Sequence, residues 1–335
     1  MRDVLQKLLD ELRTQNDNRN SVFDLQIADL ENDILSLRGK ILDQNQLATL
    51  KGTVLKLFPG LSLETTSVHV LNGRSGARAH VATNLTGLYE KPTLHLPISS
   101  ELCYGTEVEV LHEEDKWAFI RQKDGYLGWA FKSHLAEGAA SPATHLVLAP
   151  SCELRVRPNA TSEVVTRLVS GMGVQVEAVR GEWARVIANK TGWMPSSLLR
   201  PVNELPKSVE EKRKTMIEDS ARMIGVPYMW GGTSGNGIDC SGLARLVHKW
   251  VGIDLPRDAD MQHRAAKLIE PRFEVGDLLF FREPGKKRPV THMGISLGGW
   301  TMVHSSQSNN GVYIDDVQKR EDLEAMFVSA GSFLR

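Results

Sequence analysis

The sequence has few cysteines and no long apolar run, and both absences narrow the possible classes of protein. Three cysteines, Cys103, Cys152 and Cys240, occur in 335 residues. An odd number of widely separated cysteines is a poor disulfide framework and suits a reducing compartment. No apolar stretch approaches the roughly 18 residues that a membrane-spanning helix needs. We therefore expect no membrane partner and no more than one disulfide.

The chain also lacks an excess of charge of either sign. Forty basic residues face forty-one acidic ones, which leaves a formal net charge of -1. Such a balance gives no reason to expect nucleic acid as a partner. The first twenty residues alternate apolar and charged side chains, with no apolar core and no small-residue cleavage site of a secretory signal. These features predict a cytoplasmic protein.

Metal-binding motifs are missing as well. The sequence contains no His-Glu-x-x-His and no pair of Cys-x-x-Cys motifs, which are the spacings typical of zinc sites. We expect neither a metal nor another cofactor.

At this length the chain should divide into several modules, each with its own core. Apolar residues at helical spacing predict a helix over residues 3–15, and two alternating runs over residues 23–41 predict a β-hairpin. A second helix after Asp43 and a strand near residues 68–70 complete a small α/β domain, residues 1–72. We expect it to act as a scaffolding or dimerising element, followed by a linker over residues 73–84.

An internal repeat occupies the middle of the chain. Four residues of its first copy recur 66 positions later, and a Gly-Trp and Leu pattern recurs after a two-residue shortening: Gly105, Val108, Val110 and Trp117 as Gly171, Val174, Val176 and Trp183, and Gly128, Trp129 and Leu135 as Gly192, Trp193 and Leu199. Each copy alternates apolar and polar residues in short runs, which predicts a small antiparallel barrel. The pattern resembles bacterial SH3 (SH3b) domains. We assign the first to residues 73–138 and the second to residues 139–202.

A candidate nucleophile opens a helix in the last part of the chain. The glycine-rich loop 231–237 leads into Asp239, Cys240 and Ser241, and an apolar face that includes Leu243 follows at helical spacing. A cysteine in the first turn of a helix is exposed to unpaired backbone N–H groups, which favour the thiolate. Glycines in the loop would let backbone approach a substrate closely. An unremarkable buried thiol is the alternative, so the assignment needs a base.

Two of the ten histidines lie where a base and its partner would be expected. His292 and His304 are on predicted strands joined by a Gly298-Gly299 turn, and 304 − 292 = 12 residues separate them. A hairpin would make their imidazoles neighbours on one face. A thiol, a base and a third polar group that orients the base form the usual arrangement for nucleophilic catalysis.

These residues carry a family resemblance. The order and spacing of the following motifs resemble the NlpC/P60 signature: Pro227-Tyr228-Met-Trp230-Gly-Gly, Asp239-Cys240-Ser241-Gly242, Leu255-Pro256-Arg257, Gly276-Asp277-Leu-Leu-Phe-Phe, His292-Met-Gly-Ile-Ser-Leu-Gly and His304-Ser-Ser. The resemblance implies a papain-like α+β domain over residues 203–335 and a cysteine peptidase acting on peptidoglycan stem peptides. By the same resemblance Cys240 is the nucleophile, His292 the base, His304 its orienting partner, and Tyr228 an aid to the oxyanion.

Two SH3b modules before such a domain resemble one branch of the family, the wall-recycling dipeptidyl peptidases. This branch releases L-Ala-D-Glu from stem peptides with a free N-terminal L-Ala. The resemblance assigns substrate binding to Asp239, Ser241 and Arg257, and to a tyrosine and an acid of the first SH3b domain. Tyr126 fits the tyrosine, whereas the acid is Glu101 or Glu107. An N-cap role for Asp239 is the alternative interpretation.

Two other functions stay open at this point. A γ-D-glutamyl endopeptidase on intact peptidoglycan would use the SH3b domains as wall anchors. A binding or scaffolding protein with an inactive peptidase domain is disfavoured by the complete set of one cysteine and two histidines. The sequence does not distinguish lysine from diaminopimelate as the third stem residue, and it does not give the oligomeric state.

Overall fold

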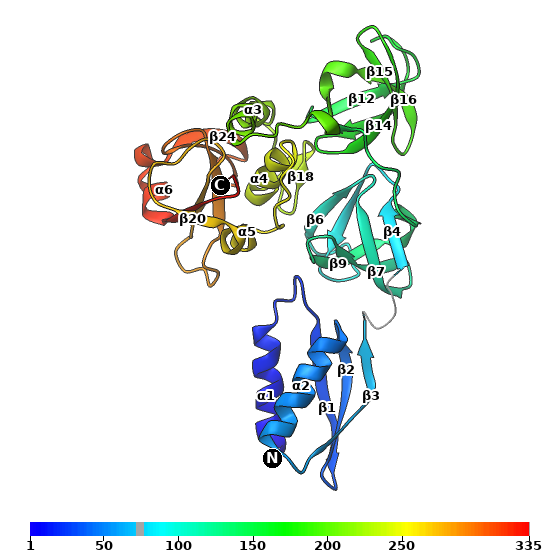
Figure 1. Cartoon of the computed structure of the whole chain (residues 1–335), viewed down its shortest axis with the longest axis vertical. Coiled ribbons are helices and arrows are strands. Elements are labelled where there is room, and N and C mark those ends of the chain that lie inside the picture. The colour runs from blue at the N-terminus through cyan, green and yellow to red at the C-terminus, as the bar shows by residue number, and fades with distance from the viewer. Residues whose placement is uncertain (72–76, 335) are drawn as a thin grey trace.

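The computed structural model describes residues 1–71 and 77–334. Its N-terminal unit projects from the rest of the chain (Figure 1). The unit contains α1 (Arg2–Gln15), β1 (Phe23–Glu31), β2 (Ile34–Ile41), α2 (Gln44–Leu57) and β3 (Ser62–Val70). Strands β1 and β2 are antiparallel, and β3 pairs in parallel with β2. The predicted helix, hairpin and small α/β arrangement are therefore present.

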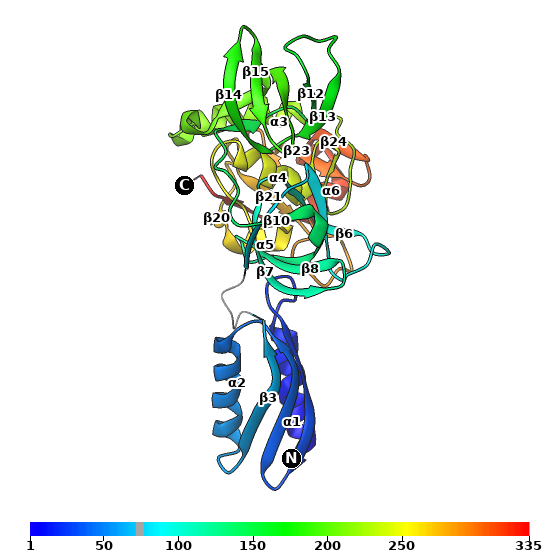
Figure 2. The same cartoon turned by 90° about the vertical axis from the view of Figure 1, so that its right-hand side faces the viewer.

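Apolar spacing explains how the N-terminal unit packs. The helices α1 and α2 place buried leucines against the sheet, as Leu5 and Leu50 illustrate, and Leu25 and Leu37 meet them from β1 and β2. Figure 2 shows this unit as a separate layer of sheet and helices. Burying a leucine side chain stabilises a fold by roughly 1.5–3 kcal/mol, so this unit has a core of its own.

The first barrel follows immediately. Its strands are β4 (Ala77–Val81), β5 (Leu85–Tyr89), β6 (Ile98–Cys103), β7 (Glu107–Glu114), β8 (Trp117–Gln122), β9 (Leu127–Phe131) and β10 (Leu135–Glu137), with a 3₁₀ turn over Lys132–His134. They pair in the order β10-β4-β7-β8-β9-β5-β6. The expected linker over residues 73–84 is wrong for the part that forms β4, because Ala79 and Val81 are buried core residues there. Positions 73–76 of that linker lie outside the described residues.

The second barrel repeats this arrangement. Its strands are β11 (His145–Val147), β12 (Ser151–Arg155), β13 (Val164–Val169), β14 (Gly173–Arg180), β15 (Trp183–Ile187), β16 (Thr191–Pro195) and β17 (Leu199–Pro201), with 3₁₀ turns over Ser196–Leu198 and Val202–Glu204. The pairing order β17-β11-β14-β15-β16-β12-β13 matches that of the first barrel strand for strand.

All three cysteines of the chain are free thiols.

The C-terminal unit is an α+β structure, as predicted. Its elements are α3 (Val209–Arg222), β18 (Thr233–Ser234), β19 (Gly237–Ile238), α4 (Cys240–Lys249), α5 (Ala259–Ala265), β20 (Lys267–Ile269), β21 (Leu278–Phe281), β22 (His292–Ser296), β23 (Thr301–Ser306), β24 (Gly311–Asp316), a 3₁₀ turn (Val317–Lys319), α6 (Glu321–Met326) and β25 (Phe327–Ser332). The large sheet is antiparallel, in the order β20-β25-β21-β22-β23-β24.

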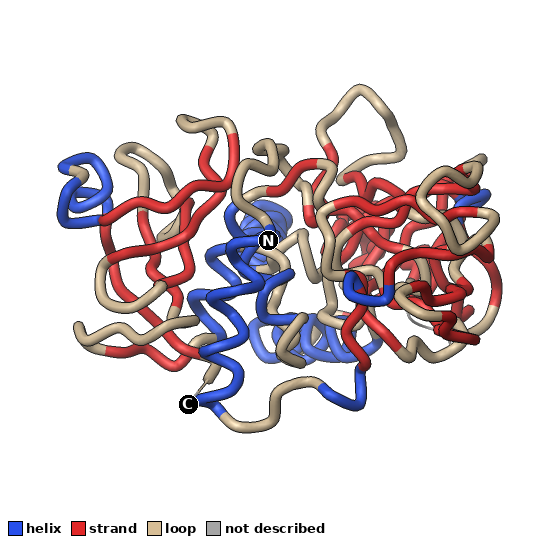
Figure 3. The backbone as a smooth tube through the Cα atoms, turned by 90° about the horizontal axis from the view of Figure 1, so that it is seen from above, coloured by secondary structure: helices blue, strands red, loops and turns tan. Residues whose placement is uncertain are grey.

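Helix α4 lies at the centre of the molecule. It packs on β22 and β23, and its apolar face joins Trp250 and Phe280 in the main core. Seen from above, a group of helices lies between two sets of strands, and one further helix lies outside the strands on the left (Figure 3). No helix within the described ranges is long and apolar enough to cross a membrane.

Candidate active site

The candidate nucleophile and base meet because α4 packs across the strand that carries the base. Cys240 is the first residue of α4, and His292 is the first residue of β22. Both line one cavity of about 400 Å³, together with Tyr228, Asp239 and Ser241. With Tyr126 of the first barrel, which also lines it, the structure brings six of the predicted site residues to a single cavity.

A chain of hydrogen bonds runs away from the cavity through the two histidines. His292 Nε2 lies 2.8 Å from His304 Nδ1, and His304 Nε2 lies 2.9 Å from the carboxylate of Asp315 on β24. Arg320 and Asn309 also donate to that carboxylate, at 3.3 Å and 3.4 Å. The histidine pair is as predicted in its geometry, whereas Asp315 was not singled out from the sequence.

The carboxylate fixes the direction of these hydrogen bonds. An ionised aspartate can only accept, so His304 Nε2 carries a proton and His304 Nδ1 is an acceptor. His292 Nε2 must then donate to His304, which leaves a lone pair on His292 Nδ1. This is the tautomer that a general base facing a thiol requires.

Burial keeps the two reacting groups neutral. It raises the pKa of the Cys240 thiol to about 12, and the charge of Asp239 adds to this effect, while the N–H groups of Met293 and Ser241 oppose it. Burial, aided by His304, lowers the pKa of His292 to about 3. The expected support of a thiolate by the helix N-terminus is therefore outweighed here by desolvation.

Tyr228 is placed to act as a hydrogen-bond donor. It lies in an isolated bridge with Ile238, just before the nucleophile, and it lines the cavity. Burial and the neighbouring Cys240 and Asp239 raise its pKa. The phenol consequently keeps its proton and can donate to a developing oxyanion.

Asp239 caps α4 and is also saturated by other donors. Its carboxylate accepts from the backbone N–H groups of Gly242 and Gly231, from the hydroxyl of Ser241 and from two nitrogens of Arg257. The closest of these contacts is 2.7 Å. A carboxylate offers about four lone-pair positions, so Asp239 has little capacity left for a substrate amine.

Arg257 links this carboxylate to the first barrel. It is 1% exposed and donates from Nε to the hydroxyl of Ser100 at 3.0 Å and from Nη1 to Ser241 at 2.9 Å. Burial opposes its charge, but Asp239 raises the pKa of Arg257 above its ordinary value. Arg257 therefore holds Asp239 and Ser241 in place, and it does not line the cavity with Cys240.

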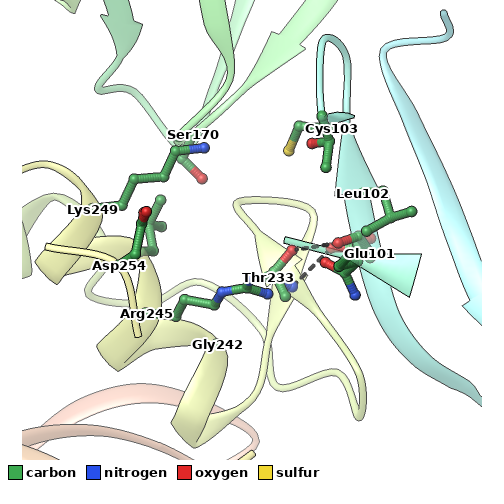
Figure 4. A pocket seen from close by; sticks show the side chains of 13 residues that line it. Glu101, Leu102, Cys103, Ser170, Thr233, Gly242, Arg245, Lys249 and Asp254 are labelled. Atoms are coloured by element: carbon green, nitrogen blue, oxygen red, sulfur yellow. Dashed lines mark hydrogen bonds between the residues drawn. The ribbon is translucent and has the colours of Figure 1, made fainter. Parts of the chain in front are cut away.

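The two acids considered for the first barrel lie elsewhere. Glu101 accepts from the backbone N–H of Thr233 at 2.9 Å and lines a separate pocket with Arg245 and Lys249 (Figure 4). Glu107 does not line the cavity of Cys240 either. The acid of the first barrel that lines that cavity is Glu90, directly after β5, beside Tyr126. Its position after an alternating strand was the available signal.

The glycine-rich loop makes close contacts with the barrels. A Cβ atom at Gly231, whose φ is +78°, would lie 2.4 Å from the carbonyl oxygen of Ile98 in the first barrel. At Gly235 it would lie 2.0 Å from the carbonyl oxygen of Pro150 in the second barrel. These two glycines allow domains to dock, in addition to any approach of substrate.

Comparison with known proteins agrees with this geometry. Residues 225–329 match the NlpC/P60 family. The C-terminal unit is an NlpC/P60 domain. Residues 88–135 match the bacterial dipeptidyl-peptidase SH3 domain, and residues 151–200 match the bacterial SH3 domain. The predicted resemblance is confirmed, and the chain is accordingly a cysteine peptidase of the NlpC/P60 type.

Named relatives extend beyond the NlpC/P60 domain. Dipeptidyl-peptidase 6 of Lysinibacillus sphaericus is 27% identical over 76% of this chain and 98% of its own length. The gamma-D-glutamyl-L-lysine dipeptidyl-peptidase of Bacillus subtilis is 27% identical over 65% of this chain and 75% of its own length. A crystal structure of an NlpC/P60 family protein from Bacillus cereus shares the fold, with a TM-score of 0.66 at 21% identity over 77% of this chain and 100% of that protein.

Within residues 1–71 and 77–334, no group of three or more His, Cys, Asp or Glu side chains is placed so that it could hold a metal ion. The reactive groups present are a thiol, two imidazoles and a phenol. Together they can carry out acyl transfer by nucleophilic attack of sulfur on a carbonyl carbon.

Proposed function

We propose that this protein is a dipeptidyl peptidase that cleaves the bond between γ-D-glutamate and a diamino acid in peptidoglycan stem peptides bearing a free N-terminal L-Ala. The product is L-Ala-D-Glu. The observation that carries this proposal is that the first barrel places a carboxylate, Glu90, and a phenol, Tyr126, on the wall of the cavity that holds the nucleophile. The names of the two relatives from Lysinibacillus and Bacillus support the same reaction.

Glu90 is the acid that we assign to the substrate amine. The other acids lining the cavity are engaged: Asp239 pairs with Arg257, Asp258 and Asp260 pair with Arg19, and Glu283 pairs with Lys286. Glu90 forms no hydrogen bond or ion pair within the described residues. A substrate ammonium needs a carboxylate when it is desolvated, since an unpaired buried charge costs several kcal/mol. Glu90 therefore takes the role in this proposal that was expected of Glu101 or Glu107.

The proposed mechanism begins with the neutral pair. As Cys240 Sγ attacks the γ-carbonyl carbon of D-glutamate, its proton passes to Nδ1 of His292, and the hydroxyl of Tyr228 donates to the oxyanion. His292 then gives that proton to the amine of the leaving diamino acid. Water, deprotonated by the same imidazole, hydrolyses the thioester and releases the thiol and L-Ala-D-Glu. His304 and Asp315 hold His292 in the required tautomer throughout.

Two further assignments accompany this proposal. The chain divides into residues 1–72, 73–138, 139–202 and 203–335, of which the last carries the chemistry. A free N-terminal amine on L-Ala exists only on peptides already detached from the glycan, so we propose a role in recycling such peptides in the cytoplasm. Cell fractionation followed by immunodetection would test the location.

Mass spectrometry of products tests the activity. Purified wild type is incubated with L-Ala-γ-D-Glu-diamino acid, made with L-lysine or with meso-diaminopimelate, and with the same peptides acetylated at the N-terminus. We expect cleavage of the free peptides and a loss of about tenfold or more in kcat/KM on acetylation, since acetylation removes the charge of the amine and its ionic contact with Glu90, whose side chain is exposed in the free protein. Cys240→Ala should show no turnover in either case.

The other outcomes point elsewhere. Equal cleavage of free and acetylated peptides would reject amine recognition and favour an endopeptidase on intact peptidoglycan. If Glu90→Gln discriminates between free and acetylated peptides as strongly as wild type, the proposed reaction would stand, but Glu90 would not be the residue that binds the amine.

A further inference from the structure

Among the described residues of the N-terminal unit, Arg19 alone lines the active-site cavity. Arg19 lies in the connection between α1 and β1, and it lines the cavity together with Glu90, Tyr126 and Cys240. Its side chain is 12% exposed. A unit expected to act as a scaffold therefore contributes part of the cavity wall.

Arg19 joins three parts of the molecule. Its guanidinium donates to Asp258 at 2.6 Å and to both oxygens of Asp260 at 2.7 Å, all in the NlpC/P60 domain. Its carbonyl oxygen accepts from the backbone N–H of Leu127 in the first barrel at 2.7 Å. Asp17, two residues earlier, accepts from Nε and Nη2 of the same guanidinium. The side chain is consequently fixed from several directions.

All donors of this guanidinium are used within the protein. An arginine side chain has five N–H donors, and the contacts with Asp17, Asp258 and Asp260 account for five. Burial opposes the charge, but the hydrogen bonds with Asp260 and Asp17 raise the pKa of Arg19. Arg19 is thus a permanent cation with no donor left for a substrate carboxylate, and its effect on substrate must come from its volume and position.

A second cavity begins on the other side of this residue. It has a volume of about 410 Å³ and lies between the N-terminal unit and the first barrel, where Arg13, Phe119 and Trp129 line it. Four residues line both cavities: Arg19, Glu90, Ser99 and Tyr126. Arg19 and Tyr126 therefore form the boundary between the active-site cavity and a space large enough for at least one further residue.

We propose that Arg19 is a specificity-determining residue, the end wall that stops a peptide at its free N-terminal amine and excludes peptides extended by further residues. This inference rests on the proposed dipeptidyl-peptidase function. It assigns to the N-terminal unit the selection of short, freed peptides over longer ones. Without the Arg19 side chain, the two cavities would join and admit an extended N-terminus.

The test compares kcat/KM for L-Ala-γ-D-Glu-L-Lys and for the same peptide extended by one N-terminal glycine, which keeps an ammonium but moves it outward. We expect full-length wild type to prefer the shorter peptide by about 100-fold, within the range that a steric wall can give. In Arg19→Ala this preference should fall about tenfold or more, mainly because the extended peptide is cut faster.

Arg264→Ala is the matched control. Arg264 also pairs with Asp260 and Asp17, but it is half-exposed and does not line the cavity. It should keep the wild-type preference. If Arg264→Ala changed the preference as much as Arg19→Ala, charge would explain the effect and the wall would be rejected. Arg19→Lys keeps the charge on a shorter side chain and should give a preference between those of wild type and Arg19→Ala. It replaces Arg19→Ala in the test if that variant does not fold.

The failures of the two proposals are distinguishable. A wild type that cuts both peptides equally would overturn the proposed function itself. A wild type that discriminates, together with a folded Arg19→Ala or Arg19→Lys that discriminates equally, would overturn the role of Arg19 alone.

Discussion

The two barrels have the same strand order but contribute differently to the site. The first places Tyr126 and Glu90 on the cavity of Cys240. The position of the second barrel that corresponds to Tyr126, by the same shift that relates Gly128 to Gly192, is Lys190, which is exposed. The shared fold therefore does not determine the role of each copy, and the residues at the ends of its strands do.

The second barrel instead holds the NlpC/P60 domain together. Arg200 donates to both oxygens of the buried Asp219 on α3, at 2.6 Å and 3.0 Å, and to the carbonyl oxygen of Trp250. The indole of Trp250 donates to the carbonyl oxygen of Val147 at 3.0 Å. We infer that variants of the first barrel change substrate preference, whereas variants of the second change stability.

The largest effect is expected from Arg200→Ala. Removing the arginine leaves Asp219 buried with Arg222 at 3.5 Å as its remaining ion pair, and breaking a buried pair costs about 3 kcal/mol or more. The urea midpoint followed by tryptophan fluorescence should fall, while kcat/KM at 25 °C stays at the wild-type value. The control is Arg167→Ala, an exposed pair of the same barrel, which should cost less than about 1 kcal/mol. An altered substrate preference in Arg200→Ala would contradict the inference that the second barrel affects stability alone.

Asp315→Asn is expected to change catalysis without changing substrate binding. Without the carboxylate, the tautomers of His304 and His292 are no longer fixed. We therefore expect kcat to fall about 100-fold, which is within the range that a general base contributes, while KM stays unchanged. Stopped-time assays over pH 5 to 9 should show the loss at every pH. Asp316→Asn, on the same strand and paired with Lys319, should retain full kcat; an equal loss there would rule out a tautomer effect.

Tyr126→Phe tests the first barrel directly. The phenol donates to Asp258 at 3.3 Å and borders the amine end of the cavity. In the proposed function the phenol also contacts the substrate amine, so loss of a hydrogen bond to that charged group should raise KM for the free peptide about tenfold, with kcat within about twofold. The corresponding Lys190→Ala in the second barrel should leave both constants unchanged. Initial-rate kinetics on the free tripeptide would measure this, and a matching change in Lys190→Ala would remove the distinction between the barrels.

The smallest effect is a pH dependence at the interface of the first barrel. Burial raises the pKa of Glu101, although Thr233, Ser234 and Arg257 oppose it. A carboxyl group with a raised folded-state pKa binds more protons when folded, so its stabilising contribution is present at low pH and is lost as pH rises. Relative to wild type, Glu101→Gln should therefore be more stable at pH 7 than at pH 4. Urea midpoints at both pH values would measure this; a difference of opposite sign would contradict the burial argument.

Regular elements were predictable because periodicity reports local burial. The spacing of apolar residues gave the helix of Cys240, the N-terminal hairpin and the strands of His292 and His304. Asp315 was missed because two adjacent aspartates end β24, and the alternation does not say which of them faces His304. For a similar reason the sequence points to Glu101 or Glu107 and does not single out Glu90. Which loop of a barrel contacts another domain is decided by how the domains dock, and no local sequence pattern encodes that.

Arg19 shows the same limit more strongly. Its partners are about 240 positions away in the sequence, and nothing in the polar segment around it distinguishes a solvated turn from a domain contact. The free energy that places it comes from three carboxylates belonging to two different units. Only the assembled structure brings these groups together.

The close contact of Gly235 with the carbonyl of Pro150 also has an evolutionary consequence. No side chain fits at position 235 while the second barrel is docked in this way, so every substitution there must be accompanied by a shift or loss of that barrel. Position 235 should thus remain glycine among homologues that dock the second barrel in this way, whatever residue stands at position 150, because the contact is with backbone atoms. A peptidase that loses its second barrel by gene rearrangement would be released from this constraint, and its loop could then diverge.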